Sequence, residues 1–98
     1  MYLGYDHITI SNSVLTVTSF TVPAKAQFVE LQATENNINY TMDNSSTPTA
    51  GTTGEGMRLV VGNAPKLFTI DDFNRIKLIR AAAADGKLNV HYGGGRDV

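Results

Sequence analysis

The residues that could do chemistry are few and far apart in this chain. The two histidines, His7 and His91, lie near opposite ends of the sequence, and neither has a neighbouring carboxylate at a metal-ligand spacing. Strands from the two ends of a chain often pair, so the two imidazoles could still meet. Alternation nevertheless places His91 away from the face that Leu88, Val90 and Tyr92 share. We therefore expect surface or contact histidines rather than metal ligands or general bases.

The acidic residues do not form a recognisable catalytic set either. Asp71 and Asp72 are adjacent, so their side chains do not point to one site, and both suit the first turn of a short helix, where the helix dipole favours negative charge. Asp6, Glu30 and Asp43 sit in separate segments. An enzyme would require the two histidines and an acid such as Asp6 to converge in the fold. We therefore expect that the chain is not an enzyme.

A glycine-rich stretch, Gly51–Gly56, is the remaining candidate for a ligand site. A phosphate-binding P-loop needs a Lys-Ser/Thr pair followed by a helix, whereas Met57–Leu59 follows here and has the composition of a strand. The many serines lack the surroundings of a nucleophile elbow. The sequence therefore predicts no catalytic, cofactor-binding or metal-binding residue, and the glycine-rich stretch is expected to be a flexible loop.

Composition and charge exclude several classes of partner. Charged residues make up 17% of the chain, with a formal net charge of −1 and no basic run, which argues against nucleic-acid binding. The absence of cysteine excludes disulfides and thiolate metal sites. No apolar run approaches the roughly 20 residues that cross a bilayer, and residues 1–6 lack the features of a signal peptide. We expect no membrane or nucleic-acid partner, and assembly in the cytoplasm.

Short β-prone segments recur along the 98 residues, and polar turns separate them. The strands that this pattern predicts cover 6–10, 14–20, 27–33, 38–42, 57–61, 67–70, 76–82 and 87–92. In the third of these segments the better core face is Val29, Leu31 and Ala33. About seven to eight short, mainly antiparallel strands at this spacing indicate an all-β protein, a small β-sandwich or barrel that forms a single domain over residues 1–98.

The segment Arg75–Ala83 is the ambiguous part of this pattern, since its alanines also permit a helix. Asp85–Gly86 decides for strands, because Asp-Gly between two strands is the strongest short-range hairpin signal. We therefore predict a hairpin of about 76–82 and 87–92. One short helical turn is expected near 71–75, capped by Thr69 or Asp71.

Three segments are predicted to lie outside the strands. Residues 43–56 contain no aliphatic core residue except Ala50, so they predict a long surface loop, and loops of this length are usually functional or mobile. Residues 1–5 and 93–98 are expected to be a flexible N-terminal arm and a flexible C-terminal tail, which could become ordered on assembly.

One run of residues goes beyond general β-strand composition. Tyr40–Thr49 resembles the Y-T-x-D-G-S-x-P-T strand and turn of small β-sandwich modules, including the accessory domain of chitobiase-like glycosidases. In this motif the aspartate accepts backbone N–H groups across a tight turn, and the proline sets the exit from it. The chain departs from the motif by one extra residue and by Asn44 in place of glycine.

The order of segments is similar to that in a group of small proteins from the virion gene clusters of tailed bacteriophages. The similarity covers about 20–92 and rests on Phe20–Ala24, Leu31–Ala33, Tyr40–Thr49, Gly56–Leu59, Phe73–Ile79 and Leu88–Tyr92. It implies a virion structural protein, first of all a capsid decoration (cement) protein that binds the major capsid protein as a homo-oligomer. A neck, tail or fibre-associated virion protein is the alternative. The Tyr40–Thr49 turn also suggests a carbohydrate-binding module, although the chain has no tryptophan for a sugar platform.

Overall fold

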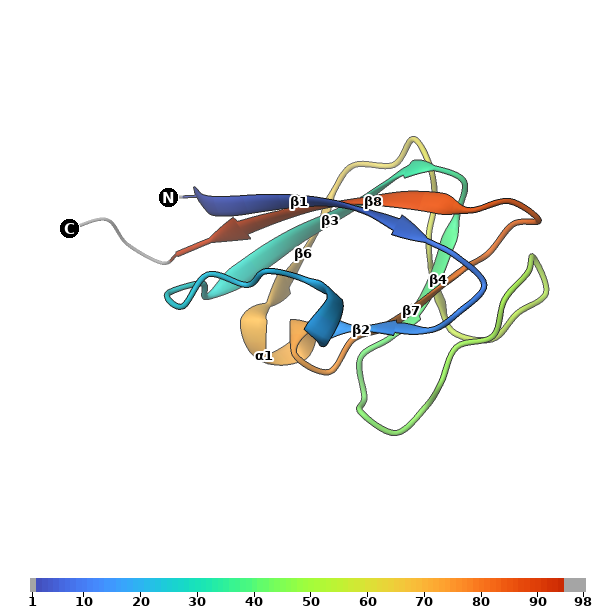
Figure 1. Cartoon of the computed structure of the whole chain (residues 1–98), viewed down its shortest axis with the longest axis horizontal. Coiled ribbons are helices and arrows are strands. Elements are labelled where there is room, and N and C mark those ends of the chain that lie inside the picture. The colour runs from blue at the N-terminus through green and yellow to red at the C-terminus, as the bar shows by residue number, and fades with distance from the viewer. Residues whose placement is uncertain (1, 95–98) are drawn as a thin grey trace.

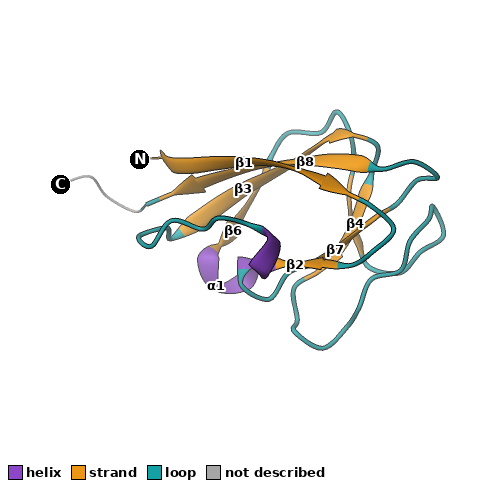
Figure 2. Cartoon of the chain, in the orientation of Figure 1, coloured by secondary structure: helices purple, strands orange, loops and turns teal. Residues whose placement is uncertain are grey.

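Two four-stranded antiparallel sheets pack face to face in the computed structural model, which describes residues 2–94 (Figures 1 and 2). Sheet A has the order β1 (Tyr2–Ile10), β8 (Gly86–Gly93), β3 (Phe28–Glu35), β6 (Lys66–Thr69). Sheet B has the order β2 (Leu15–Thr16), β7 (Lys77–Arg80), β4 (Ile38–Thr41), β5 (Met57–Leu59). A 3-10 turn, η1 (Val17–Ser19), and a short helix, α1 (Ile70–Phe73), complete the elements. The predicted all-β sandwich of seven to eight strands is confirmed.

The core lies between the sheets and follows the predicted alternation of each strand. Val29, Leu31 and Ala33 of β3 face inward, as do Leu88, Val90 and Tyr92 of β8. Sheet B contributes inward residues of the same kind, among them Ile38, Tyr40, Leu59 and Leu78. Successive residues of a strand point to opposite faces, so the same alternation sends the remaining residues of β3 and β8 to the outside of sheet A.

The predicted N-terminal arm is wrong for the described residues. Tyr2–Ile10 pairs with β8 along its whole length, with one irregularity between Tyr2 and Gly4. Gly4 lies close to the next segment, because a Cβ there would come within 3.1 Å of the Pro23 ring. At the other end Gly93 is still in the sheet, and its carbonyl accepts the Gln27 N–H at 2.8 Å. Residue 1 of the arm and 95–98 of the predicted tail lie outside the described residues.

The predicted hairpin of 76–82 and 87–92 is also wrong, although both strands exist. β7 pairs with β2 and β4 in sheet B, whereas β8 pairs with β1 and β3 in sheet A. Asp85–Gly86 therefore ends a connection between the two sheets. Neither residue has a positive φ, which a type I′ hairpin turn would need. Gly86 is required for space instead, since a Cβ there would lie 2.8 Å from the Glu35 carbonyl oxygen.

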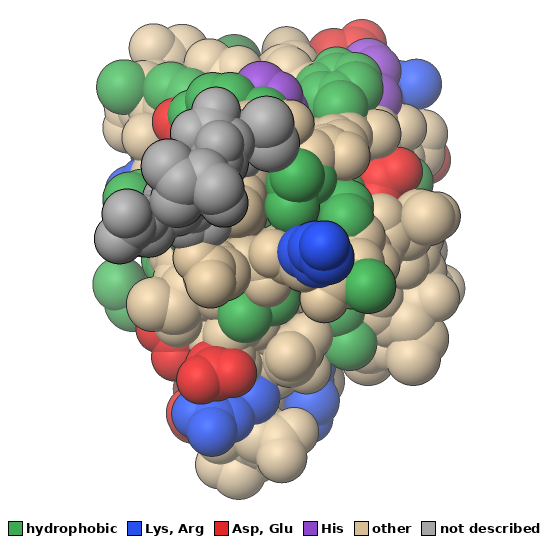
Figure 3. Space-filling model, turned by 90° about the vertical axis from the view of Figure 1, so that its left-hand side faces the viewer, with side chains coloured by type: hydrophobic (Ala, Val, Ile, Leu, Met, Phe, Trp, Pro, Cys, Tyr) green, Lys and Arg blue, Asp and Glu red, His purple; other side chains and the backbone are tan. Residues whose placement is uncertain are grey.

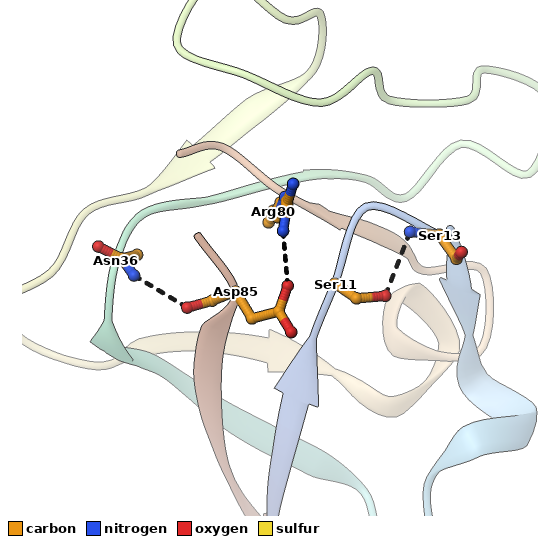
Figure 4. A network of polar contacts seen from close by, with 5 residues as sticks. All are labelled: Ser11, Ser13, Asn36, Arg80 and Asp85. Atoms are coloured by element: carbon orange, nitrogen blue, oxygen red, sulfur yellow. Dashed lines mark hydrogen bonds and ion pairs between the residues drawn. The ribbon is translucent and has the colours of Figure 1, made fainter. Parts of the chain in front are cut away.

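Polar side chains tie this end of the sandwich together (Figure 4). The Arg80 guanidinium pairs with the Asp85 carboxylate at 2.7 Å, and the Asn36 side chain donates to the Asp85 carbonyl at 2.9 Å. Asn36 itself has φ of 58°, the left-handed conformation that asparagine tolerates in turns. The turn at Asn36–Asn37 connects β3 in sheet A to β4 in sheet B.

The long loop between β4 and β5 is present as predicted, but it is fastened to the outer face of sheet B. Asn39 points out from this face and is fully buried, since its amide donates to the carbonyls of Thr49 at 2.9 Å and Gly51 at 3.2 Å. Arg58 donates to the Asn39 amide oxygen at 3.0 Å and to the Thr52 carbonyl at 2.9 Å. The loop therefore covers sheet B rather than swinging free.

The capping interpretation of the acidic pair is confirmed. Thr69 is the N-cap of α1 and its hydroxyl accepts the Asp72 N–H at 3.3 Å, while Asp71 and Asp72 occupy the first turn. The helix places Phe73 in the core, where its ring packs edge-on against Phe20 and Tyr92. The predicted strand 14–20 is largely replaced by β2 and η1.

Replacing Asn39 with alanine should release the long loop. The change removes one buried donor group and one acceptor, and leaves two loop carbonyls without their partner. We expect a loss of about 2–3 kcal/mol in the free energy of unfolding by urea, and faster proteolysis within 43–56. Asn63→Ala, at an exposed turn, is the matched control and should change neither the free energy of unfolding nor the rate of proteolysis. If proteolysis within 43–56 were no faster in Asn39→Ala, Asn39 would not be what holds the loop on sheet B.

Replacing Gly86 with alanine should destabilise the protein through crowding. The new methyl group must displace the Glu35 backbone, so we expect a loss of about 1–3 kcal/mol in the free energy of unfolding. Ala84→Gly, two residues away and exposed, should cost less than about 1 kcal/mol. Equal stability of Gly86→Ala and the parent chain would show that β3 and β8 do not approach each other as described.

Candidate binding surfaces

The outer face of sheet A brings together side chains from all four of its strands. The pairing register places Tyr5 of β1 beside His91 of β8, His91 beside Glu30 of β3, and Glu30 beside Leu67 of β6. The next row holds His7, Asn89 and Gln32. This row-by-row arrangement follows from strand alternation, because residues paired across neighbouring strands share a face.

Aromatic rings cluster at the end of this face that lies near the chain termini. The Tyr2 ring stacks on His91, with ring centroids 3.7 Å apart and planes inclined by 7°. Tyr5 meets His91 edge-on at 6.3 Å, and Phe28 meets Tyr2 edge-on at 5.9 Å. Tyr2 and Tyr5 remain 51% and 57% exposed. Figure 3 views this end of the molecule and shows histidine and hydrophobic side chains next to each other along its upper edge.

A chain of hydrogen bonds holds the polar groups of the same face. The Tyr2 hydroxyl donates to the Glu30 carboxylate, and this bond is the main reason that the pKa of Tyr2 is raised above its usual value. The Tyr5 hydroxyl donates to the Asn89 amide oxygen, and the Asn89 amide donates to the Gln32 oxygen at 3.4 Å. Side chains anchored on neighbouring strands and bonded to one another keep a defined arrangement.

The two outer faces of the sandwich are therefore unequal. The long loop covers sheet B, where Asn39 and Pro48 are fully buried. Sheet A leaves Tyr2, Tyr5 and Leu67 more than half exposed. Of the two faces, the outer face of sheet A is the one that the long loop leaves uncovered, although a hollow lies at the loop itself, between Thr41, Asp43 and Met57.

A second surface lies along one side of the sandwich, where the edge strands β5 and β6 follow each other in the chain. Within the described residues, four of the seven large hydrophobic side chains that are exposed belong to these strands and their connection: Met57, Val60, Val61 and Leu67. The Asn37 side chain holds the connection by accepting the Val61 N–H at 2.9 Å. We call this surface the β5–β6 side. It combines exposed apolar side chains with two sheet edges.

The structure brings both histidines to the outer face of sheet A, where His91 lies beside Glu30, while Asp6 lies elsewhere. β1 and β8 pair as the sequence permits, and His7 lies beside Asn89 rather than His91. Asp6 lies on the inner side of β1, where it accepts the Tyr92 hydroxyl at 2.6 Å and the Thr21 N–H at 3.0 Å. Burial, with the bond to Asp6, raises the pKa of Tyr92. The stacking of Tyr2 on His91 was not expected from the sequence, because it depends on the register of β1 against β8.

Among residues 2–94, no group of three or more histidine or acidic side chains lies close enough to hold a metal ion. Asp43 is engaged locally, as the Tyr40–Thr49 motif implies. Its carboxylate accepts the backbone N–H groups of Ser45 at 3.1 Å and Ser46 at 2.8 Å, and the Ser46 hydroxyl at 2.6 Å. Asn44, which stands in place of the motif's glycine, has φ of 63°. Asparagine, like glycine, tolerates this left-handed conformation.

None of the helices in the described part of the chain is both long and apolar enough to span a membrane. Comparisons with protein-family models, curated proteins and solved structures found no match for the chain. The candidate surfaces therefore stand on their geometry and chemistry.

The Asp43 turn makes a prediction about pH. Bonds from Ser46 and Ser45 lower the pKa of Asp43 from 3.8 to about 2, so their stabilising effect is present above pH 3.8 and is lost as the pH falls through about 2. A carboxyl-carbon NMR titration should give this midpoint. Ser46→Ala removes the hydroxyl donor and should raise the midpoint toward 3.8. Ser45→Ala is the matched control, since Ser45 donates only its backbone N–H. An equal rise of the Asp43 midpoint in both variants would show that the Ser46 hydroxyl is not the group that lowers it.

Proposed function

We propose that this chain is a structural protein of a tailed-bacteriophage virion, and specifically a capsid decoration protein that binds the outer head surface and stabilises the capsid subunits. The segment order over 20–92 gives the proposal its biological setting. The observation that carries the docking mode is the β5–β6 side, where exposed apolar side chains adjoin two sheet edges. A protein with this role needs a rigid body and an adhesive side, and it needs no active site.

Two physical effects suit the β5–β6 side to docking on the major capsid protein. Burial of Met57, Val60, Val61 and Leu67 would remove apolar surface from water, the main favourable term in protein association. The edge strands β5 and β6 carry backbone groups that can extend a neighbour's sheet. A single contact of this size is weak. Many copies on one lattice, or a small symmetric oligomer, would give avidity.

The size of the domain supports a role in assembly. A chain of 98 residues buries only about 60–65% of the surface of its unfolded state, so its stability alone is modest. Binding to the native state adds stability by mass action. Decoration would therefore stabilise the protein and the capsid together.

The alternative is a neck, tail or fibre-associated protein of the same particle. The number of copies per virion separates the two roles, since a capsid lattice offers on the order of hundreds of equivalent sites and the tail axis about six or twelve. Quantitative mass spectrometry of purified virions, or imaging of the particle, gives this number.

The docking mode can be tested with two matched substitutions. Val61 and Val14 are 39% and 38% exposed, and they lie respectively on the β5–β6 side and on the connection between β1 and β2. Val61→Glu would bury a carboxylate in the interface, so we expect at least about tenfold weaker binding to capsids purified without the protein. Val14→Glu should bind like the parent chain.

Co-sedimentation with the capsids measures this binding, and circular dichroism confirms that both variants are folded. Equal binding by the two variants would remove the β5–β6 side as the docking surface. If the parent chain did not bind the capsids, and virions that lack it were as stable as complete ones, the decoration role itself would be wrong.

A further inference from the structure

A hollow of about 250 Å³ lies on the outer face of sheet A. It is lined by Tyr5, Glu30, Gln32, Pro65, Asn89 and His91, which come from three strands and one turn. This volume is somewhat below the roughly 300–1,000 Å³ of sites for drug-sized ligands. The hollow therefore suits a ligand of about one sugar ring.

The polar lining offers both hydrogen-bond donors and acceptors. The bond from Asn89 uses the Gln32 oxygen, and the Tyr2 hydroxyl uses one Glu30 oxygen. Among the described residues, the Gln32 amide nitrogen and the other Glu30 oxygen have no hydrogen-bond partner. An amide nitrogen donates and a carboxylate accepts, so the pair can bind neighbouring hydroxyl groups, which do both.

An aromatic wall stands beside these polar groups. Tyr5 is 57% exposed, and His91 is held between the stacked ring of Tyr2 and the edge of Tyr5. The electron-rich face of an aromatic ring attracts weakly positive C–H groups such as those on the apolar face of a sugar ring. An apolar wall next to convergent polar groups is the combination that a sugar ring requires.

We infer that the hollow on the outer face of sheet A is a binding site for a neutral saccharide unit, with Tyr5 as the stacking wall and Glu30, Gln32 and Asn89 as hydroxyl ligands. The Glu30 carboxylate excludes anionic sugars and phosphates by repulsion, and no Lys or Arg lines the hollow to compensate. The site goes beyond the docking role, since it takes a small ligand on the face of sheet A. It adjoins the β5–β6 side, because Pro65 lies on the connection between β5 and β6 and Leu67 pairs with Glu30.

Titration of the full chain with simple sugars tests the inference. The probes are glucose, galactose, N-acetylglucosamine and glucuronate, followed by ¹H–¹⁵N NMR. We expect saturable shifts around Tyr5, Gln32 and Asn89 with at least one neutral sugar, at a Kd in the millimolar range, which suits a single sugar ring. Glucuronate should bind more weakly, and Glu30→Gln should remove that difference. Tightest binding by glucuronate to the parent chain would overturn the charge argument.

Substitutions show whether the hollow is the site. Gln32→Ala removes one hydrogen-bonding group, so affinity should fall about tenfold, and Tyr5→Ala should lower it at least as much by removing the wall. Thr9→Ala, on the same face but outside the hollow, is the matched control and should bind normally. If Tyr5→Ala does not fold, the affinity of Gln32→Ala alone shows whether the hollow is the binding site.

The outcomes also separate this inference from the docking proposal. Absence of saturable shifts with every neutral sugar would overturn the saccharide site. If Gln32→Ala and Tyr5→Ala weakened capsid binding instead, the face would belong to a protein interface, and the saccharide assignment would be wrong. Loss of capsid binding only in Val61→Glu, with normal sugar binding, would support two separate surfaces.

Discussion

Sheet A depends on its central strand β8, which is the last strand in the chain. β1 and β3 have no pairing with each other, and each reaches the other only through β8. The same strand supplies three fully buried core side chains, Leu88, Val90 and Tyr92. Its outward residues, Asn89 and His91, lie at the centre of the candidate saccharide site. The hydrophobic core, the pairing of sheet A and the candidate saccharide site therefore all depend on β8.

Most strands in both sheets pair with strands that are distant in the sequence. Within the described residues, β4 and β5 are the only consecutive strands that pair, and the long loop 43–56 separates them. Every other connection between consecutive strands crosses from one sheet to the other. Loop closure must precede such contacts, so a fold of this kind forms more slowly than one built from hairpins. The buried Asn39 joins the long loop to sheet B.

Much of the fold could be predicted from local sequence because burial imposes a period of two on a strand. That period identified the inward faces of 27–33 and 87–92, and capping chemistry identified Thr69 at the start of the helix. Asp85–Gly86 misled because a turn signal says nothing about which sheet receives the next strand.

The features that escaped prediction depend on contacts between distant residues. Tyr2–Tyr5 looked like an arm because the partner of this segment lies more than 80 residues away, in β8. The site on sheet A depends on the same register, since Tyr5, Glu30 and His91 meet only after three strands align. Likewise, the composition of 43–56 suggested mobility, and the bonds from Asn39 and Arg58 reveal that the loop is held on sheet B.

The short length of β5 and β6 has a consequence for how the free protein behaves in concentrated solution. Open sheet edges are templates for indiscriminate growth, and long, flat, apolar edges lead to aggregates. Here they span only three and four residues, and Lys66 adds a charge to one of them. Such short edges offer few backbone hydrogen bonds to another strand. The brevity of these two strands thus limits growth of the sheets on the β5–β6 side, whereas β1, the opposite edge of sheet A, spans nine residues.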